Sequence, residues 1–402
     1  MSATFVKLGS VAEFINGVAF KPEDWGDSGT KIIRIQNLTD PSKSFNRTER
    51  TVSDKYCVRP GDLLVSWSAT LGVFEWLGPD EALLNQHIFR VLPDENKVEK
   101  RYLRYALDGA LLDMQRHLHG ATMQHVNRGE FLNTKLFLPS LPDQKRIADI
   151  LDRAEALRAK RRAALAQLDE LVQSIFIDMF GDPVTNTKGW SRIKLEELIV
   201  IGPQNGLYKP ASDYGSGVPI LRIDAFYDGQ VTKLSTLKRL RISDEELNLY
   251  KLSPGDIVIN RVNSMEYLGK SAIIPYLDEP VVFESNMMRF SVDQNKIEPQ
   301  YLVQFLQTNF IKGQIMNSAK HAVNQSSINQ KDVKSFQVNV PPLPLQKEFI
   351  RRVEAINKLK STHKASLAEL DELFSSLQYR AFRGELSETP EINEQSSEGV
   401  KI

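Results

Sequence analysis

The longest regular pattern of apolar positions in the chain runs from residue 144 to residue 180. The spacing of three or four residues places them on one face of a helix, close to a heptad seam. No glycine or proline interrupts the pattern, and Gly181-Asp182-Pro183 forms a turn signal that ends it. A helix of this length with so narrow an apolar stripe requires a partner. The apolar positions are Ile147, Ile150, Ala154, Leu157, Ala164, Leu168, Leu171 and Ile175.

A second segment with the same pattern spans residues 346–382, and the two align without a gap at an offset of 202 residues. The seven residues 165–171 (LAQLDEL) match 367–373 (LAELDEL), and Leu-Pro-x-Gln-Lys precedes both segments. Two unrelated surface helices are the alternative explanation. The shared block and the shared lead-in favour an internal duplication in which each copy ends in a long helix that packs on the other.

The regions before the two helices repeat more weakly. Residues 1–142 read as a mixed α+β unit, with strands at 31–35, 63–67, 73–77 and 86–91 and a helix at 101–114. Asn16-Gly17 recurs as Asn205-Gly206, and Pro60-Gly61-Asp62 recurs as Pro254-Gly255-Asp256. The loops between these anchors differ in length, which suits two different recognition tasks. We therefore predict globular units at 1–142 and 183–344, long helices at 143–182 and 345–385, and a disordered polar tail at 386–402.

Composition limits the class of protein. The chain has 51 basic and 51 acidic residues, so its formal net charge is zero. A stand-alone nucleic-acid binder is usually basic, so neutrality weighs against DNA as the partner of the isolated chain unless other subunits supply part of the phosphate contacts. One cysteine, Cys57, excludes an internal disulfide. The absence of a long apolar run or a secretory pattern predicts a cytoplasmic protein without membrane contact.

The candidate catalytic motifs are incomplete. Leu268-Gly269-Lys270-Ser271 resembles the end of a phosphate-binding loop, but Ser264 stands where that loop needs a glycine. The acidic and lysine residues within 93–97 lie in one turn, whereas a nuclease site draws them from separate strands. Histidines 117, 119 and 125 lack a neighbouring cysteine or carboxylate at metal-ligand spacing. We expect no catalytic residue, no metal site and no cofactor bound by this chain.

The duplicated junctions carry a resemblance to a known family. Leu138-Pro139-Ser140-Leu141-Pro142-Asp143-Gln144-Lys145 and Pro341-Pro342-Leu343-Pro344-Leu345-Gln346-Lys347 each precede a helix with Leu-x-x-Leu-Asp-Glu-Leu. Over about residues 5 to 385 the chain resembles the specificity subunits of type I restriction–modification systems. The resemblance implies two target recognition domains, each followed by a long helix, with the helices packed as an antiparallel coiled coil of pseudo-two-fold symmetry.

The resemblance also implies partners. It indicates a non-catalytic protein that binds double-stranded DNA, two modification (methyltransferase) subunits and, in the full enzyme, restriction subunits. S-adenosylmethionine is expected on the modification subunit, and the DNA target is expected to have two parts with a fixed spacer. Two other functions remain open from the sequence: a duplicated coiled-coil scaffold that binds proteins without DNA, and a fused enzyme with its own nuclease or methyltransferase.

Base edges are read by polar side chains, so we searched the loops that follow predicted strands. The solvent faces of the helices, including residues 160–164, are candidate docking surfaces for modification subunits. Candidate DNA contacts are Ser66, Trp67, Ser68, Thr70, Thr122, Gln124, His125 and Arg128 in the first unit, and Asn260, Arg261, Asn263, Ser264, Lys320, Asn324, Gln325 and Ser326 in the second. The predicted helix-pair interface comprises Ile147, Ile150, Leu157, Leu168, Leu171, Ile175, Phe349, Ile356, Leu359, Leu370, Leu373 and Leu377.

Overall fold

The computed structural model describes residues 4–40, 42–117, 128–232, 234–321 and 325–386. The chain forms two compact units, Met1–Ala163 together with Lys364–Ile402, and Ala164–His363. Each unit contains one mixed helix-and-sheet domain and half of each long helix. The compact units therefore extend beyond the predicted domain ends at residues 142 and 344. The predicted tail, residues 387–402, lies outside the described residues.

The two long helices confirm the duplication. Helices α4 (Leu141–Phe180) and α9 (Leu343–Phe382) have 40 residues each. Each helix begins three residues before its Gln-Lys pair, where the apolar pattern of the sequence starts. Pro142 and Pro344 therefore lie in the first turn. Proline is tolerated there because the first N–H groups of a helix have no partner within the helix. After α4, Gly181 has φ +76°, a left-handed conformation that favours glycine at a helix end.

Within each unit the two helix halves run antiparallel. In the first unit, Ile147 and Leu151 near the start of α4 share a core with Ala381 near the end of α9, and Arg158 pairs with Asp371. In the second unit, Asp169 of α4 pairs with Lys360 of α9, while the rings of Phe176 and Phe349 lie 5.6 Å apart. Higher numbers on α4 thus meet lower numbers on α9 in both units.

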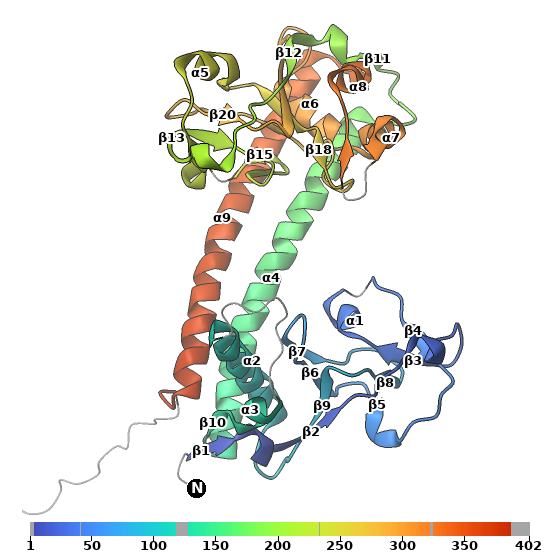
Figure 1. The fold of residues 1–402 in the computed structure, drawn as a ribbon, viewed down its shortest axis with the longest axis vertical. Helices are drawn as coiled ribbons and strands as arrows, with labels where there is room; N and C mark the ends of the chain where they lie inside the picture. Colours follow the sequence, from blue (N-terminus) through green and yellow to red (C-terminus); the bar gives the residue numbers. More distant parts are fainter. Residues whose placement is uncertain (1–3, 41, 118–127, 233, 322–324, 387–402) are drawn as a thin grey trace, which may run out of the picture. The chain divides into compact units, whose positions relative to one another are not determined.

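The described residues of the first unit form one strand pair and two four-stranded sheets, with strand orders β1-β10, β2-β9-β6-β7 and β4-β3-β8-β5. Helix α2 packs against β7 (Figure 1). The elements are β1 (Thr4–Lys7), β2 (Ala12–Asn16), β3 (Thr30–Ile33), α1 (Ile35–Thr39), β4 (Asn46–Thr48), β5 (Cys57–Val58), β6 (Leu63–Ser66), β7 (Gly72–Glu75), β8 (Ala82–Leu84), β9 (Ile88–Pro93), α2 (Lys100–His117), α3 (Arg128–Asn133) and β10 (Lys135–Leu138).

The described residues of the second unit form the strand orders β11-β24, β12-β21-β17-β19-β15-β14, β16-β13-β20 and β18-β23-β22. Its elements are β11 (Ser191–Lys194), β12 (Ile199–Asn205), β13 (Tyr214–Leu221), β14 (Phe226–Tyr227), β15 (Gly229–Val231), β16 (Arg239–Leu240), α5 (Asp244–Tyr250), β17 (Ile257–Asn260), β18 (Val262–Asn263), β19 (Ser271–Ile273), β20 (Val282–Phe283), β21 (Met287–Val292), α6 (Pro299–Leu306), α7 (Asn309–Ser318), β22 (Lys320–His321), β23 (Ser326–Ser327), α8 (Gln330–Ser335) and β24 (Gln337–Val340).

The two domains share a strand order. The order β2-β9-β6-β7 in the first unit recurs as β12-β21-β17-β19 in the second, and the parallel pair β3–β8 recurs as β13–β20. The predicted strand at 31–35 is wrong at its end, because β3 stops at Ile33 and α1 begins at Ile35. The predicted strands at 63–67, 73–77 and 86–91 correspond to β6, β7 and β9 with shifted ends.

The repeated Asn-Gly pair marks a close approach of two backbones. A Cβ on Gly17 would lie 2.1 Å from the carbonyl oxygen of Asn85, and one on Gly206 would lie 2.2 Å from that of Glu284. Only glycine fits at either position without a shift of the backbone. The short sequence repeat is therefore a packing requirement of the shared scaffold.

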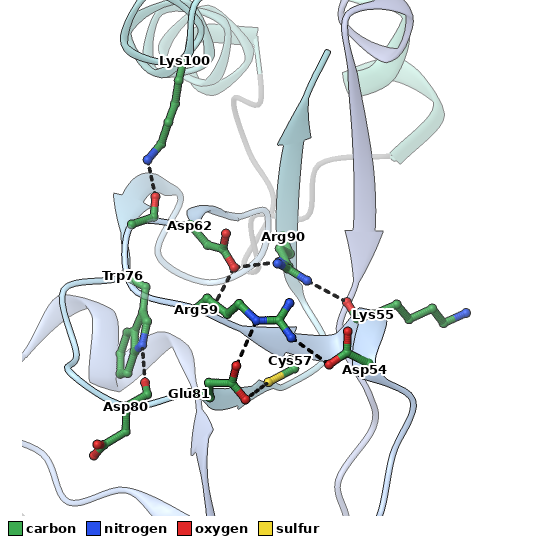
Figure 2. Close-up of polar contacts among 11 residues, drawn as sticks. Asp54, Lys55, Cys57, Arg59, Asp62, Trp76, Asp80, Glu81, Arg90 and Lys100 are labelled. Atoms are coloured by element: carbon green, nitrogen blue, oxygen red, sulfur yellow. Dashed lines mark hydrogen bonds and ion pairs between the residues drawn. The ribbon is translucent and has the colours of Figure 1, made fainter. Parts of the chain in front are cut away.

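The repeated Pro-Gly-Asp turn is held by a carboxylate. Asp62 Oδ2 accepts from the backbone N–H of Arg59 at 2.8 Å and from Nε of Arg90 at 2.7 Å (Figure 2). In the second unit, Asp256 accepts from the N–H of Ser253 at 2.8 Å, and its carboxylate lies 3.6 Å from Arg289. These aspartates bind the turn to the neighbouring strand, which gives them a structural role.

The repeated Gln-Lys junction fixes each domain to its long helix. Gln144 is fully buried; its Oε1 accepts from Glu99 N–H at 2.8 Å, and its Nε2 donates to the carbonyls of Lys97 at 3.0 Å and Pro139 at 2.9 Å. Gln346 makes the equivalent contacts with Glu298, Lys296 and Pro341. The most recognisable motif of the sequence is thus a buried amide that joins the start of the helix to the domain. Within the described part of the chain, no helix is both long and apolar enough to cross a membrane.

Candidate functional site

The structure brings the two predicted polar segments of the second unit together. Strand β18 follows β17 and pairs with β23, with Asn263 opposite Ser326, and β23 pairs in turn with β22, which contains Lys320. Segments about 60 residues apart in the sequence thus form one small sheet beyond the end of β17. Ser264, Lys320 and Gln325 are exposed on it, and Asn263 is half-buried.

Arg261 lies at the base of this small sheet. Its backbone N–H donates to the carbonyl of Asn286 at 2.8 Å, and its own carbonyl accepts from Ile328 at 3.0 Å. Its Nη1 donates to the carbonyl of Ser285 at 3.0 Å, while the buried Nε has no hydrogen-bond partner in the part of the chain that the structure describes. The guanidinium is therefore held in place by a carbonyl.

The sequence did not indicate the role of Lys270, which lies beside these residues. Its carbonyl accepts from Asn260 N–H, and its Nζ donates to the carbonyl of Ile223 at 2.7 Å. The same Nζ lies 4.0 Å from the ring centre of Tyr227 and 5.4 Å from that of Tyr267, both of which are exposed. The Gly-Lys-Ser sequence thus places a lysine against aromatic rings, and the surrounding segment is a short turn before β19. No signal in the sequence distinguishes this arrangement from an ordinary loop.

In the first unit, the equivalent loop after β6 is built around Trp67. The indole stacks on the buried ring of Phe89 with centres 5.7 Å apart, and its Nε1 donates to Asn16 Oδ1 at 3.2 Å. The guanidinium carbon of Arg128 lies 5.9 Å from the ring centre of the same Phe89, and the guanidinium donates a hydrogen bond to the carbonyl of Phe14. Trp67 and Arg128, predicted from separate segments, therefore meet at one aromatic cluster.

Two residues of this loop region have left-handed backbone conformations. Ala69 has φ 56° and His87 has φ 71°, values that are uncommon for residues other than glycine. Ala69 and Thr70 are exposed at the tip of the turn between β6 and β7. Strained residues of this kind gather at binding loops because the surrounding fold must hold them.

Four of the candidate DNA contacts are buried and serve the fold of the chain, and their contact with DNA stays a prediction. Ser66 and Asn260 occupy the last, fully buried positions of β6 and β17. Asn260 Nδ2 donates to the carbonyl of Tyr267, and Ser66 Oγ donates to that of Ser68. These polar groups satisfy the backbone of the loops. The four are Ser66, Ser68, Asn260 and Ser326. Thr122, Gln124, His125 and Asn324 lie outside the described residues.

The residues of the predicted helix-pair interface differ in burial. Ile147, Phe349 and Ile356 are buried, and Ile150, Leu168, Ile175, Leu370 and Leu377 are half-buried. The leucines predicted for the seam at 157, 171, 359 and 373 are 50%, 43%, 53% and 48% exposed. Distance from the helix end does not explain the difference, because Leu171 and Leu373 are exposed although they lie nearer a helix end than the half-buried Leu168 and Leu370. The domains bury other positions of the helices, such as Leu151 and Phe176.

The exposed leucines follow the duplication. Leu157 and Leu359 are related by the offset of 202 residues, as are Leu171 and Leu373. In the first unit, Leu157 is adjacent in sequence to Arg158, and Leu373 is two residues from Asp371, the partner of Arg158 in an ion pair. In the second unit, Leu359 is adjacent to Lys360, and Leu171 is two residues from Asp169, the partner of Lys360. Each unit thus presents two leucines near one ion pair.

Over the described residues, no group of three or more histidine, cysteine, aspartate or glutamate side chains is placed to hold a metal ion. The 93–97 segment is the predicted turn, in which Lys97 pairs with Asp94 at 2.8 Å. His119 and His125 lie outside the described residues.

Comparison with known proteins gives a consistent result. A family model described as type I restriction modification DNA specificity domain matches residues 3–167 and 187–372. The EcoBI specificity subunit of Escherichia coli is 26% identical over 95% of this chain and 86% of its own length. The StySPI specificity subunit of Salmonella potsdam is 28% identical over 94% of this chain and 88% of its own.

Two solved structures resemble the fold. A type I restriction–modification S subunit from M. genitalium matches with a TM-score of 0.51 at 14% identity, covering 95% of this chain and 96% of that one. A chain from a structural study of the assembly of a type I system matches with a TM-score of 0.54 at 18% identity, covering 95% and 98%. At these identities the likeness concerns the fold. It supports two tandem domains, each followed by a long helix.

Proposed function

Because the chain belongs to the family of type I restriction–modification DNA specificity subunits, its function is recognition of a DNA target, and we propose that each unit reads one half of a two-part sequence. The observation that carries this proposal is the repeated strand order with unlike loops at the same edge. Residues 67 and 261 occupy equivalent positions, since the N–H of each donates to the carbonyl of an equivalent residue, His87 or Asn286. One is tryptophan and the other arginine.

Unlike side chains at equivalent positions predict unlike half-sites. The first unit offers an indole, an exposed threonine and the guanidinium of Arg128. The second offers Arg261, Asn263, Ser264, Lys320 and Gln325. Arginine, asparagine and glutamine suit the hydrogen-bonding edges of bases, whereas apolar groups suit the thymine methyl. Phosphate contacts would position the duplex without reading it.

The proposed partners are two modification subunits and, in a full enzyme, restriction subunits. The exposed leucine pairs, Leu157 with Leu373 and Leu171 with Leu359, are the proposed docking points for the modification subunits. Exposed leucines at duplicated positions would let two copies of one partner bind in equivalent ways. The chain itself is proposed to be non-catalytic, with S-adenosylmethionine and methyl transfer located on the modification subunit. The length of the long helices is proposed to fix the spacer.

The test is a genome-wide map of methylated bases in a host that carries this chain and its modification subunit, with deletion of the chain as control. We expect a two-part motif that disappears on deletion. Exchange of residues 1–142 for the corresponding domain of a relative should change one half of the motif only. Methylation that persists without the chain in an active system would contradict the recognition function, and it is the result that a protein-binding scaffold predicts.

A further inference from the structure

Arg261 differs in its partners from the other two half-buried arginines of its domain. Arg222 and Arg289 each form an ion pair with a glutamate or aspartate. Arg261 forms no ion pair among the described residues of the chain, and its one side-chain hydrogen bond goes to the carbonyl of Ser285. A half-buried cation without a carboxylate is costly to maintain unless it meets an acceptor from outside. Its position therefore needs an explanation other than stability.

The hydrogen bonds leave a defined part of the guanidinium available. Nε points into the protein, where it is buried without a partner, and one hydrogen of Nη1 is taken by Ser285. Among the described residues, the second hydrogen of Nη1 and those of Nη2 have no acceptor, and the outer two form the end-on fork of the group. A fork of two parallel N–H groups recognises two acceptors in one plane, such as guanine O6 and N7 or two oxygens of a phosphate.

We propose that Arg261 specifies a G·C pair, through guanine O6 and N7, in the half-site read by the second unit; this inference rests on the proposed function. Guanine is favoured over phosphate because the group is held at both its backbone and its side chain. A fixed plane suits a fixed pair of acceptors, whereas the exposed single ammonium group of Lys320 on β22 suits phosphate. Trp67, at the equivalent position of the first unit, has one N–H donor and uses it on Asn16. The first unit therefore lacks a guanidinium at this position.

The experiment compares three versions of the assembled methyltransferase, which contain the wild-type chain, the Arg261→Lys variant or the Arg261→Gln variant. Lysine keeps the charge and loses the fork, and glutamine loses both the charge and the fork. Arg239→Lys is the matched control, because Arg239 is an exposed arginine of the same domain that pairs with Glu279. Methylomes are mapped in the host, and the purified complexes are tested against duplexes that carry every base pair at each position of the second half-site. Thermal unfolding of each variant reports on folding.

We expect both Arg261 variants to lose discrimination at one G·C position by about tenfold or more, the size typical of a bidentate base contact. The first half-site, the spacer and the Arg239→Lys motif should stay unchanged. Binding that weakens uniformly over all sequences, with a shallower dependence on salt and recovery in Arg261→Lys, would identify a phosphate contact and overturn the proposal. A second half-site without any G·C pair, or one read unchanged by both variants, would also overturn it. If the wild-type chain directs no sequence-dependent methylation, the proposed function itself fails, and this outcome is distinct from the others.

If Arg261→Gln unfolds, Arg261→Lys and the wild type decide the question. A folded Arg261→Lys variant that keeps full discrimination at every G·C position refutes the proposal without the glutamine variant. A folded Arg261→Lys variant that accepts other pairs at one such position supports it.

Discussion

The buried amide of Gln144 provides a quantitative test of how each domain is joined to its helix. Replacing Gln144 by alanine removes three hydrogen bonds, of 2.8, 3.0 and 2.9 Å, from the backbone groups of Glu99, Lys97 and Pro139. Alanine is a good helix former, so the helix itself is not penalised. A buried group left without a partner costs about 1–3 kcal/mol. Since water can reach some of the three groups, we expect a total loss of about 2–4 kcal/mol.

The measurement is urea unfolding of the full chain together with hydrogen exchange at the Glu99 amide. Lys145→Ala is the matched control, because Lys145 is the exposed neighbour in the same motif. A change at an exposed position is usually within about 0.5 kcal/mol. Gln346→Ala tests the second copy, in which one of the three bonds is longer, at 3.4 Å. We expect a slightly smaller loss there, confined to exchange at Glu298.

This reasoning is refuted if Gln144→Ala unfolds at the same urea concentration as Lys145→Ala. It is also refuted if Glu99 keeps its protection from exchange, since that would show that the amide bond is not what holds the junction. If mutation of one glutamine removed the protection from exchange at both Glu99 and Glu298, the two junctions would not be independent of each other.

Three further predictions concern packing, pH and docking. Tyr102→Phe and Tyr301→Phe each remove a buried hydroxyl that donates to a carbonyl, of Phe137 and Asn339 respectively, and should each lower the free energy of unfolding by about 1 kcal/mol in urea titrations. Burial raises the pKa of Asp108 to about 6, above its unfolded value, so the folded chain binds the extra proton and stability should fall as pH rises from about 4 through 6. Asp108→Asn should flatten this dependence, and an unchanged profile would contradict it. Leu157→Glu with Leu373→Glu should weaken binding of the modification subunit at least about tenfold in calorimetry, because buried leucines contribute about 1.5–3 kcal/mol each, without altering thermal unfolding.

The duplication could be predicted from the sequence because the same physical requirements act twice. Gln144 and Gln346 must satisfy equivalent backbone groups, and Gly17 and Gly206 must allow equivalent close approaches. Such positions tolerate one residue type, so they remain recognisable while the loops change. The pattern of apolar residues on the helices is equally local, and it identified both helices to within three residues of their starts.

The burial of individual residues could not be predicted, because it depends on neighbours that are distant in sequence. The apolar stripe includes Leu157 and Leu171 as much as Ile147, yet only Ile147 is covered by its domain. Likewise, Asn260 and Arg261 are adjacent polar residues after a strand, but the first turns inward to the carbonyl of Tyr267. The aromatic surroundings of Lys270 come from two separate segments, neither of which is informative alone.

The neutral chain uses part of its positive charge within the scaffold. Arg90, Arg158 and Lys360 are paired with carboxylates that hold the scaffold together. Among the described residues, Arg128, Arg261 and Lys320 form no ion pair, and all three lie in the segments that we propose contact DNA. Because basic and acidic residues are equal in number, the net charge available to attract phosphate is small. Since the slope of affinity against salt reflects the number of neutralised phosphates, the isolated chain should bind DNA with a shallow salt dependence. If the other subunits of the proposed complex supply further phosphate contacts, the assembled complex should show a steeper one.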